Sequence, residues 1–174
     1  FNCVLFLFSL SLFSQGDQIE ITDFNTKISL ASDNFTNSIG NIMGSPYVVE
    51  KFQSVRLKNY ENKVYSGRFN AFNNEMEIIV DAGNRPVALD ITNDDQEVYF
   101  IAQDKTYKSF TYTTDRGVSK RGFLVVVSEN EGVGLLKEEI VKFYDFVKAN
   151  SSYVQDKPAK FERSADNYYV KFKD

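Results

Sequence analysis

Histidine and tryptophan are absent from this 174-residue sequence, and Cys3 is its only cysteine. Without imidazole and with a single thiol, the chain lacks the usual general bases, thiol nucleophiles and transition-metal ligands, which excludes most hydrolase and zinc mechanisms. A single cysteine forms no internal disulfide, so stability has to come from a hydrophobic core. The sequence also contains no P-loop, no G-x-S-x-G and no S-x-x-K motif. We therefore assign no catalytic residue, no metal site and no cofactor.

Long apolar runs are scarce as well. The run at the start, FNCVLFLFSLSLFSQ, is uncharged over about a dozen residues, whereas a membrane-spanning helix needs roughly 20. Such a length is typical of a signal peptide, so we predict that residues 1–14 are removed and that the protein is periplasmic or secreted. We expect no transmembrane segment in the mature chain. Because the chain begins with Phe1, we expect the basic part of the signal to lie upstream, and further chain to follow Asp174.

Charge excludes another class of function. The chain carries 24 acidic and 20 basic residues, a formal net charge of -4 at pH 7. A nucleic-acid-binding domain is usually basic, with lysine and arginine gathered on one face. We therefore expect no nucleic-acid partner, and we expect another envelope protein or surface instead.

The pattern of residues changes along the mature chain. Residues 15–45 are rich in Asn, Ser, Thr and Asp and predict a loosely structured lead-in. Residues 46–174 alternate between apolar and polar positions, with turn signals about every ten residues, which is typical of a single β-rich domain. In YSGRFNAFNNEMEIIVD the pair Asn73-Asn74 predicts a two-residue turn, with Ala71 opposite Met76 and Phe69 opposite Ile78.

Three further segments have strand character. Asp104-Lys105 predicts a second turn, with Phe100 opposite Ser109. The run FLVVV at 123–127 predicts a strand buried on both faces. The segment after Pro158 predicts a strand pair around Asp166-Asn167.

The segment LLKEEIVKFYDFV at 135–147 is ambiguous. Leu136, Ile140, Phe143 and Val147 fit helical spacing and favour a helix, yet the same segment is dense in strand-forming residues. Periodicity leaves both structures open.

Three stretches together resemble an uncharacterised family of secreted, β-rich proteins of flavobacteria and their relatives in the Bacteroidota. They are GSPYVVEKF at 44–52, FNAFNNEMEI at 69–78 and KPAKFERSADNYYVKFKD at 157–174. The resemblance implies successive antiparallel strands, with 135–144 as a strand. It also implies a short lysine-rich helix beyond Asp174, and it brings no catalytic residues.

Two clusters of charge are candidate sites. Arg116, Lys120 and Arg121 fall in the predicted loop DRGVSKRG, where they are suited to contact an anionic partner or a lipid headgroup. The acidic stretch DITNDDQE at 90–97 offers oxygen ligands, but its spacing does not fit a calcium-binding loop. We interpret the acidic stretch as a solvated turn.

The sequence as a whole predicts a mainly β fold, an antiparallel meander that forms a curved sheet, a sandwich or a partly open barrel with little helix. The predicted function is that of an exported, non-catalytic binding or scaffolding module of the cell envelope. Two alternatives remain open. A carbohydrate-active enzyme could use two carboxylates, and a small-ligand carrier could use a barrel cavity.

Overall fold

The computed structural model describes residues 21–22, 42–60, 63–80, 85–92, 96–151, 153 and 155–172. These residues form two antiparallel β-sheets and two short 3-10 helices, which confirms the predicted mainly β class with little helix. The elements are β1 (Ile21–Thr22), β2 (Gln53–Leu57), η1 (Lys58–Tyr60), β3 (Tyr65–Asn70), β4 (Glu75–Ile79), β5 (Pro86–Leu89), β6 (Glu97–Phe100), η2 (Ile101–Gln103), β7 (Lys105–Thr113), β8 (Ser119–Glu129), β9 (Val133–Glu138), β10 (Val141–Tyr144), β11 (Lys160–Arg163) and β12 (Asn167–Phe172). The predicted signal peptide and most of the predicted lead-in lie outside the described residues.

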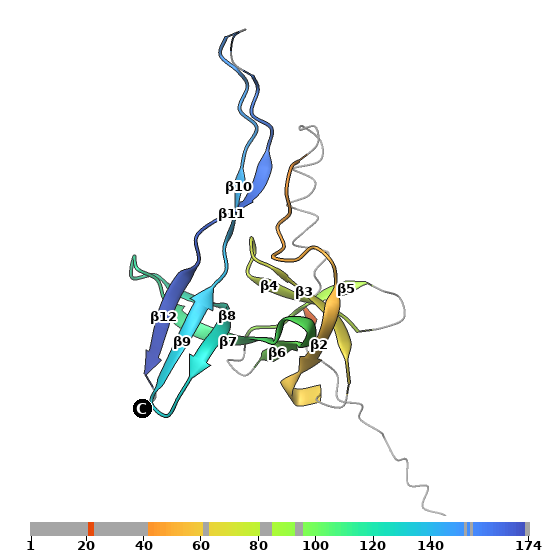
Figure 1. Ribbon diagram of the computed structural model, residues 1–174, viewed down its shortest axis with the longest axis vertical. Helices are drawn as coiled ribbons and strands as arrows, with labels where there is room; N and C mark the ends of the chain where they lie inside the picture. The colour runs from red at the N-terminus through yellow and green to blue at the C-terminus, as the bar shows by residue number, and fades with distance from the viewer. Residues whose placement is uncertain are drawn as a thin grey trace, which may run out of the picture.

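The main sheet is open, with strand order β1-β5-β4-β3-β2-β6-β7-β8-β9-β12 (Figure 1). Two meanders meet side by side in it, since β2 pairs with β3 on one side and with β6 on the other. Short turns join most neighbours, as antiparallel pairing allows. The second sheet contains β10 and β11 alone.

The core follows from strand alternation, because every second side chain of a strand points to the same face. Apolar residues of both meanders bury themselves together, and each large one contributes on the order of 1.5–3 kcal/mol by leaving water. The buried cluster comprises Val55, Leu57, Phe69, Ala71, Met76, Ile78, Leu89, Val98, Phe100, Tyr107, Phe123, Val125 and Val141.

The hairpin of β3 and β4 differs from its predicted register. Phe69 pairs with Met76 rather than with Ile78, so the connection is a four-residue loop, 71–74, and the predicted two-residue turn is wrong. The loop is wider because the Asn70 Oδ1 accepts hydrogen bonds from the backbone N–H groups of Phe72 and Asn73, at 3.1 Å each. A shift of two residues keeps each side chain on its predicted face, and Phe69, Met76 and Ile78 are all buried as expected.

Asn74 has a positive φ of 56°, a conformation that asparagine tolerates in tight turns. Its side chain also reaches β8, where the Oδ1 accepts a hydrogen bond from the Phe123 N–H at 2.6 Å and the Nδ2 donates to the Phe123 carbonyl at 3.2 Å. Gly122 makes this approach possible, since a Cβ there would lie 2.6 Å from the Asn74 Oδ1.

The β6–β7 connection is also longer than predicted. Phe100 pairs with Lys105 rather than with Ser109, and the 3-10 helix η2 occupies the connection. Asp104 ends that helix with a φ of 48°, so the predicted turn residue is present but the predicted pairs are wrong.

The apolar run of β8 is confirmed as a buried strand at Phe123, Leu124 and Val125. Val127 is exposed, because the pairing of β8 with β9 shifts between Val126 and Ser128. An extra residue at such a bulge changes which face the following side chains occupy.

The ambiguous segment 135–147 is strand and not helix. In this segment β9 is followed directly by β10, and further along the chain β11 is followed directly by β12. Because β9 pairs with β12 and β10 pairs with β11, the two segments lie side by side as a long ribbon. The predicted strands after Pro158 are present, but they do not pair with each other, because β11 pairs with β10 and β12 pairs with β9. The predicted strand pair around Asp166-Asn167 is therefore wrong.

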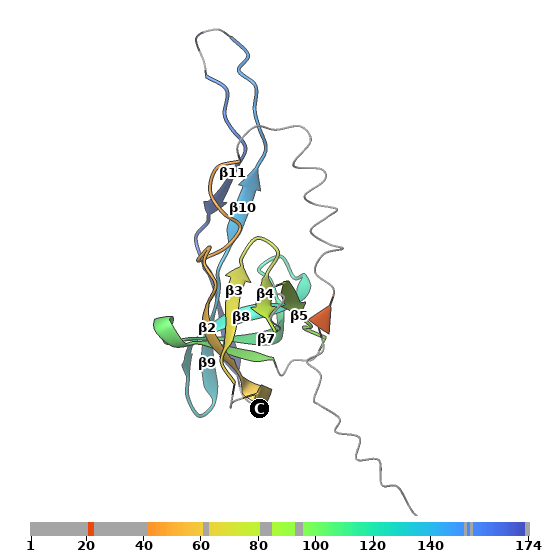
Figure 2. The ribbon, with the colours of Figure 1, turned by 90° about the vertical axis from the view of Figure 1, so that its right-hand side faces the viewer.

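The far end of this ribbon, here called the arm, comprises β10, β11 and the loop between them. It projects away from the main sheet in both views (Figures 1 and 2). Phe143 and Phe161 of the arm contact Phe72, with ring centroids 6.4 and 5.3 Å from the Phe72 ring. Met43, in the predicted lead-in, lies beside β11, and its backbone carbonyl accepts a hydrogen bond from the Phe161 N–H at 2.8 Å.

Candidate interaction surface

The three predicted site residues do not form one patch. Arg116 lies in the turn between β7 and β8, whereas Lys120 and Arg121 belong to β8 itself rather than to a loop. Consecutive strand residues point to opposite faces, so Lys120 and Arg121 diverge. Their role as a contact for an anionic partner stays a prediction.

The two strand residues also have different surroundings. Arg121 donates hydrogen bonds to the Thr111 hydroxyl, at 3.1 Å, and to the Thr92 carbonyl. Lys120 lies on the other face, where its charge helps to lower the pKa of Glu138. All three cations are exposed to solvent.

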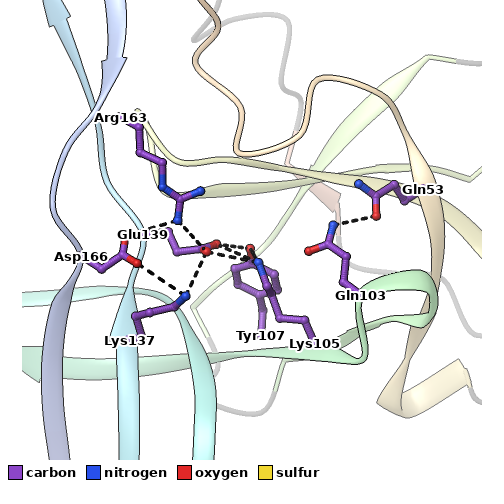
Figure 3. Close-up of polar contacts among 8 residues, drawn as sticks. All are labelled: Gln53, Gln103, Lys105, Tyr107, Lys137, Glu139, Arg163 and Asp166. Carbon is purple, nitrogen blue, oxygen red and sulfur yellow. Dashed lines mark hydrogen bonds and ion pairs between the residues drawn. The ribbon is translucent and has the colours of Figure 1, made fainter.

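A buried carboxylate holds the junction between the main sheet and the arm (Figure 3). Glu139, only 2% exposed, lies between β9 and β10. Its carboxylate accepts hydrogen bonds from the Lys105 Nζ at 3.2 Å, the Lys137 Nζ at 3.2 Å, the Arg163 guanidinium at 2.9 Å and the Tyr107 hydroxyl. These donors come from β7, β9 and β11, so one side chain links three strands.

Asp166 extends this network. Its carboxylate lies 3.5 Å from the Lys137 Nζ and 3.3 Å from the Arg163 guanidinium (Figure 3). Burial by itself raises the pKa of Glu139, but the hydrogen bond from Tyr107 and the charges of Lys105 and Arg163 lower it to about 2. Burial and the neighbouring Glu139 raise the pKa of the Tyr107 hydroxyl. Glu139 is therefore charged and Tyr107 neutral at physiological pH.

The network lies where the ribbon is irregular. Glu138 pairs with Asn167 and Val141 pairs with Arg163. The segment 139–140 between β9 and β10 therefore faces the segment 164–166 between β11 and β12. Three residues on one side face two on the other, and the extra residue makes a β-bulge, which bends a ribbon. The ion network lies at this bulge, where it joins Lys137 of β9 and Arg163 of β11 to Glu139 and to Asp166, the residue before β12.

Glu138 points to the opposite face of the ribbon. It accepts hydrogen bonds from the Tyr112 hydroxyl at 2.8 Å, the Tyr169 hydroxyl at 2.8 Å and the Asn167 Nδ2 at 3.0 Å. Burial raises the pKa of Glu138, and these hydrogen bonds outweigh burial and lower it. The Tyr112 and Tyr169 rings also contact each other, with centroids 4.9 Å apart, so this face of β12 is covered by β7.

A third buried carboxylate, Glu77, is likewise surrounded by donors. It is fully buried, with an Oε2 2.7 Å from the Arg68 Nε and an Oε1 that accepts a hydrogen bond from the Tyr47 hydroxyl at 2.9 Å. The Arg68 guanidinium stacks over the Tyr47 ring at 3.7 Å. These contacts anchor the segment before β2 to the sheet.

Beside the Glu139 network lies a small pocket. Phe100, Gln103 and Gln53 line it, and the Gln103 side chain donates a hydrogen bond to that of Gln53 at 2.7 Å. Its volume is about 10 Å³, room for one water, whereas ligand pockets hold roughly 300 Å³ or more.

Strand β12 forms an edge of the main sheet. In the described part of the chain β9 is the strand it pairs with, and it lies last in the strand order. Along one face it presents three large apolar side chains to solvent: Tyr168 is 61% exposed, Val170 55% and Phe172 73%. Val133, which pairs with Phe172, is 46% exposed beside them. We call Tyr168, Val170 and Phe172 the edge strip.

Lys171 is the one charged residue of β12, and it does not interrupt the edge strip. It points to the other face, where its Nζ lies 4.9 Å from the centroid of the Phe110 ring. Gly134 lies opposite Lys171 on β9. In the part of the chain that the structure describes, no strand pairs with the outer edge of β12. An apolar strip beside such an edge is a surface that proteins normally protect or use.

Comparison of the chain with protein-family models, with curated proteins and with solved structures finds no match in any of the three. Among the described residues, no group of three or more acidic, cysteine or histidine side chains is arranged to hold a metal ion. The predicted acidic turn falls partly outside them, at 93–95. No helix in the described ranges has the length and apolar character to cross a bilayer.

The edge strip is visible in the sequence as the alternation of Tyr168, Val170 and Phe172. Sequence reasoning misses its exposure because it pairs this strand with the segment before Asp166. The buried pair Glu138-Glu139 carries no local signal, since its partners are far apart in the chain.

Proposed function

We propose that this protein is an exported, non-catalytic binding or scaffolding module of the cell envelope, related to the secreted β-rich proteins that its motifs resemble. Its binding surface is the free edge of β12. The observation that carries the proposal is the edge strip, three exposed apolar side chains on a strand that lies last in the sheet.

An edge of this kind binds proteins by adding a strand. The backbone N–H and C=O groups of β12 supply hydrogen bonds, and the alternate side chains of the edge strip select the partner. Natural edge strands are commonly blocked by charges pointing outward, by bulges or by short length. β12 extends over Asn167–Phe172, its pairing with β9 is regular, and its lysine is packed over Phe110.

The enzyme alternative has weaker support. A glycosidase needs a carboxyl group with a raised pKa to act as general acid. In Glu138 and Glu139 the pKa is lowered, and their oxygens are occupied by tyrosine, amide and cationic donors. The carrier alternative requires a closed cavity, and the main sheet is open.

Export is tested at the N-terminus. If the apolar start is a signal peptide, protein recovered from the periplasm or the medium begins near Gln15. Edman sequencing or intact mass measures this. Recovery from the cytoplasm of a chain that still carries residues 1–14 would contradict the proposal.

Binding is tested by placing a photo-crosslinking residue at Phe172 in cells that make the protein. We expect a discrete crosslinked product, and we expect Val170→Lys to abolish it because a charge interrupts the edge strip. The matched control is Val64→Lys, at a residue 58% exposed but remote from β12, which should leave the product unchanged. If both variants lose the crosslinked product, or if both keep it, β12 is not the binding surface.

A further inference from the structure

We propose that the partner at the edge of β12 is a second copy of this chain, paired antiparallel about a two-fold axis that passes midway between the two Val170 residues. This inference rests on the proposed function, since it names the occupant of the same edge. It assigns the protein as a dimer in which two main sheets join into one.

Symmetry restricts how two copies can pair. Two identical edges that pair antiparallel are related by a two-fold axis perpendicular to the sheet, so residues facing each other lie on the same face of both copies. With the axis at Val170, this residue faces its own counterpart. Tyr168 then faces Phe172 of the second copy, and Tyr169 faces its Lys171.

The side chains favour this register over its neighbours. Moving the axis to Lys171 places two lysines directly opposite each other, which is destabilising. Moving it to Tyr169 places Asn167 opposite Lys171 and leaves Phe172 without an apolar partner. Only the axis at Val170 matches every member of the edge strip with an apolar residue.

The opposite face accepts the same register without a charge conflict. Tyr169 is already held by Tyr112 and Glu138, and Lys171 by the ring of Phe110. Pairing sets the Tyr169 ring beside the Lys171 stem of the second copy, a cation and aromatic pair that is favourable across strands. The Glu139 network contributes by fixing β12 relative to the arm, so the edge meets its copy as a preformed strand.

A closed dimer is also favoured over a filament. The other end of the strand order is β1, so an antiparallel pair of β12 strands involves one edge of each sheet. Pairing of β12 with β12 consumes both edges and closes, whereas pairing of unlike edges propagates.

The register is tested by disulfide formation in the full chain carrying Cys3→Ser. In the Val170→Cys variant, paired Cα atoms lie about 4.5–5.5 Å apart, within the roughly 4.4–6.8 Å that a disulfide spans. We expect a covalent dimer on mild oxidation. The matched controls are Tyr168→Cys and Phe172→Cys, each about 14 Å from its own counterpart in this register, which should stay monomeric. The double variant Tyr168→Cys/Phe172→Cys should crosslink again.

Sedimentation of the wild-type chain should show a dimer that dissociates on dilution. Val170→Lys should sediment as a monomer that melts at the temperature of the dilute, dissociated wild type. Equal crosslinking at 168, 170 and 172 would indicate random collision and overturn the inference. So would a wild-type monomer at all concentrations. If the Phe172 photo-crosslink then captured a different envelope protein, the proposed function would stand and only the identity of the partner would fall.

Discussion

The Asn74 side chain makes the two backbone hydrogen bonds to Phe123 that a neighbouring strand would otherwise make. The loop 71–74 has no backbone pairing with β8, but the amide group of Asn74 gives Phe123 the acceptor and the donor that a neighbouring strand would supply. The positive φ of Asn74 explains why asparagine or glycine suits this position. The two hydrogen bonds explain why it holds asparagine.

This distinction makes Asn74→Gly informative. Glycine adopts the same φ without strain, so turn geometry alone predicts a neutral or stabilising change. Because both hydrogen bonds to Phe123 are lost, we expect the variant to be less stable by about 1–2 kcal/mol. Urea denaturation measures the free energy of unfolding. Asn74→Val should cost more, since it adds backbone strain.

Two controls sharpen the test. Asp104→Gly removes another residue with positive φ whose hydrogen bond, from the Tyr99 hydroxyl, is exposed, and it should change stability little. Gly122→Ala should be destabilising in the wild type but much less so beside Asn74→Gly, because its Cβ clashes with the Asn74 side chain. An Asn74→Gly variant as stable as the wild type would assign the residue to turn geometry alone.

The ribbon of β9, β10, β11 and β12 is the element that gives the molecule its shape. Two antiparallel segments of the chain extend from the main sheet into the arm. The bulge at 164–166 separates the pairing of β9 with β12 from the pairing of β10 with β11. The contacts at its base are the Glu139 network and the rings of Phe72, Phe143 and Phe161. The loop beyond Val147 and Lys157 is joined to the body only through this ribbon in the described residues.

The arm can therefore be shortened without loss of stability. Val147 and Lys157 exchange two backbone hydrogen bonds of 2.9 Å each, the arrangement that closes a two-residue hairpin. Replacing residues 148–156 with Asn-Gly should leave the free energy of unfolding within about 1 kcal/mol, because the shorter loop offsets the lost contacts. Thermal unfolding checks this. A loss of several kcal/mol would mean that the loop packs against the body.

At the scale of the whole molecule, stability depends on buried negative charge. The folded-state pKa of Glu139 is about 2, well below its ordinary value of 4.5, and the pKa of Glu138 is lowered too. A lowered folded-state pKa contributes stability that is present above the ordinary pKa. This stability is lost as pH falls through the folded value.

We accordingly expect the free energy of unfolding to fall between about pH 4.5 and pH 2, with Glu139 alone contributing about 3 kcal/mol of the change. Glu139→Gln should be destabilised at pH 7, because Lys105, Lys137 and Arg163 each lose a buried anionic partner, and should show a shallower decline over the acid range. Denaturation at a series of pH values measures both. A variant whose decline matches that of the wild type would show that other groups govern acid unfolding.

The mainly β class and the buried faces follow from the sequence alone. Strand alternation depends on neighbours two residues apart, so it assigns Phe69, Met76 and Ile78 to the core even though the hairpin register is shifted. The absence of histidine and the single cysteine likewise limit the chemistry that the chain can perform, because composition does not depend on how the strands pair.

Pairing partners, in contrast, are decided by the tertiary structure. The registers of the hairpins depend on Asn70 and η2, and β12 joins β9 rather than the strand just before it. The segment 135–147 has helical spacing, but its first part pairs with β8 and β12 as β9, and its second part pairs with β11 as β10. The Glu139 network joins residues that are far apart in the chain, and the exposure of the edge strip depends on which strand β12 pairs with, so both depend on long-range strand pairing. Local patterns determine which face a side chain occupies, whereas long-range pairing determines what that face meets.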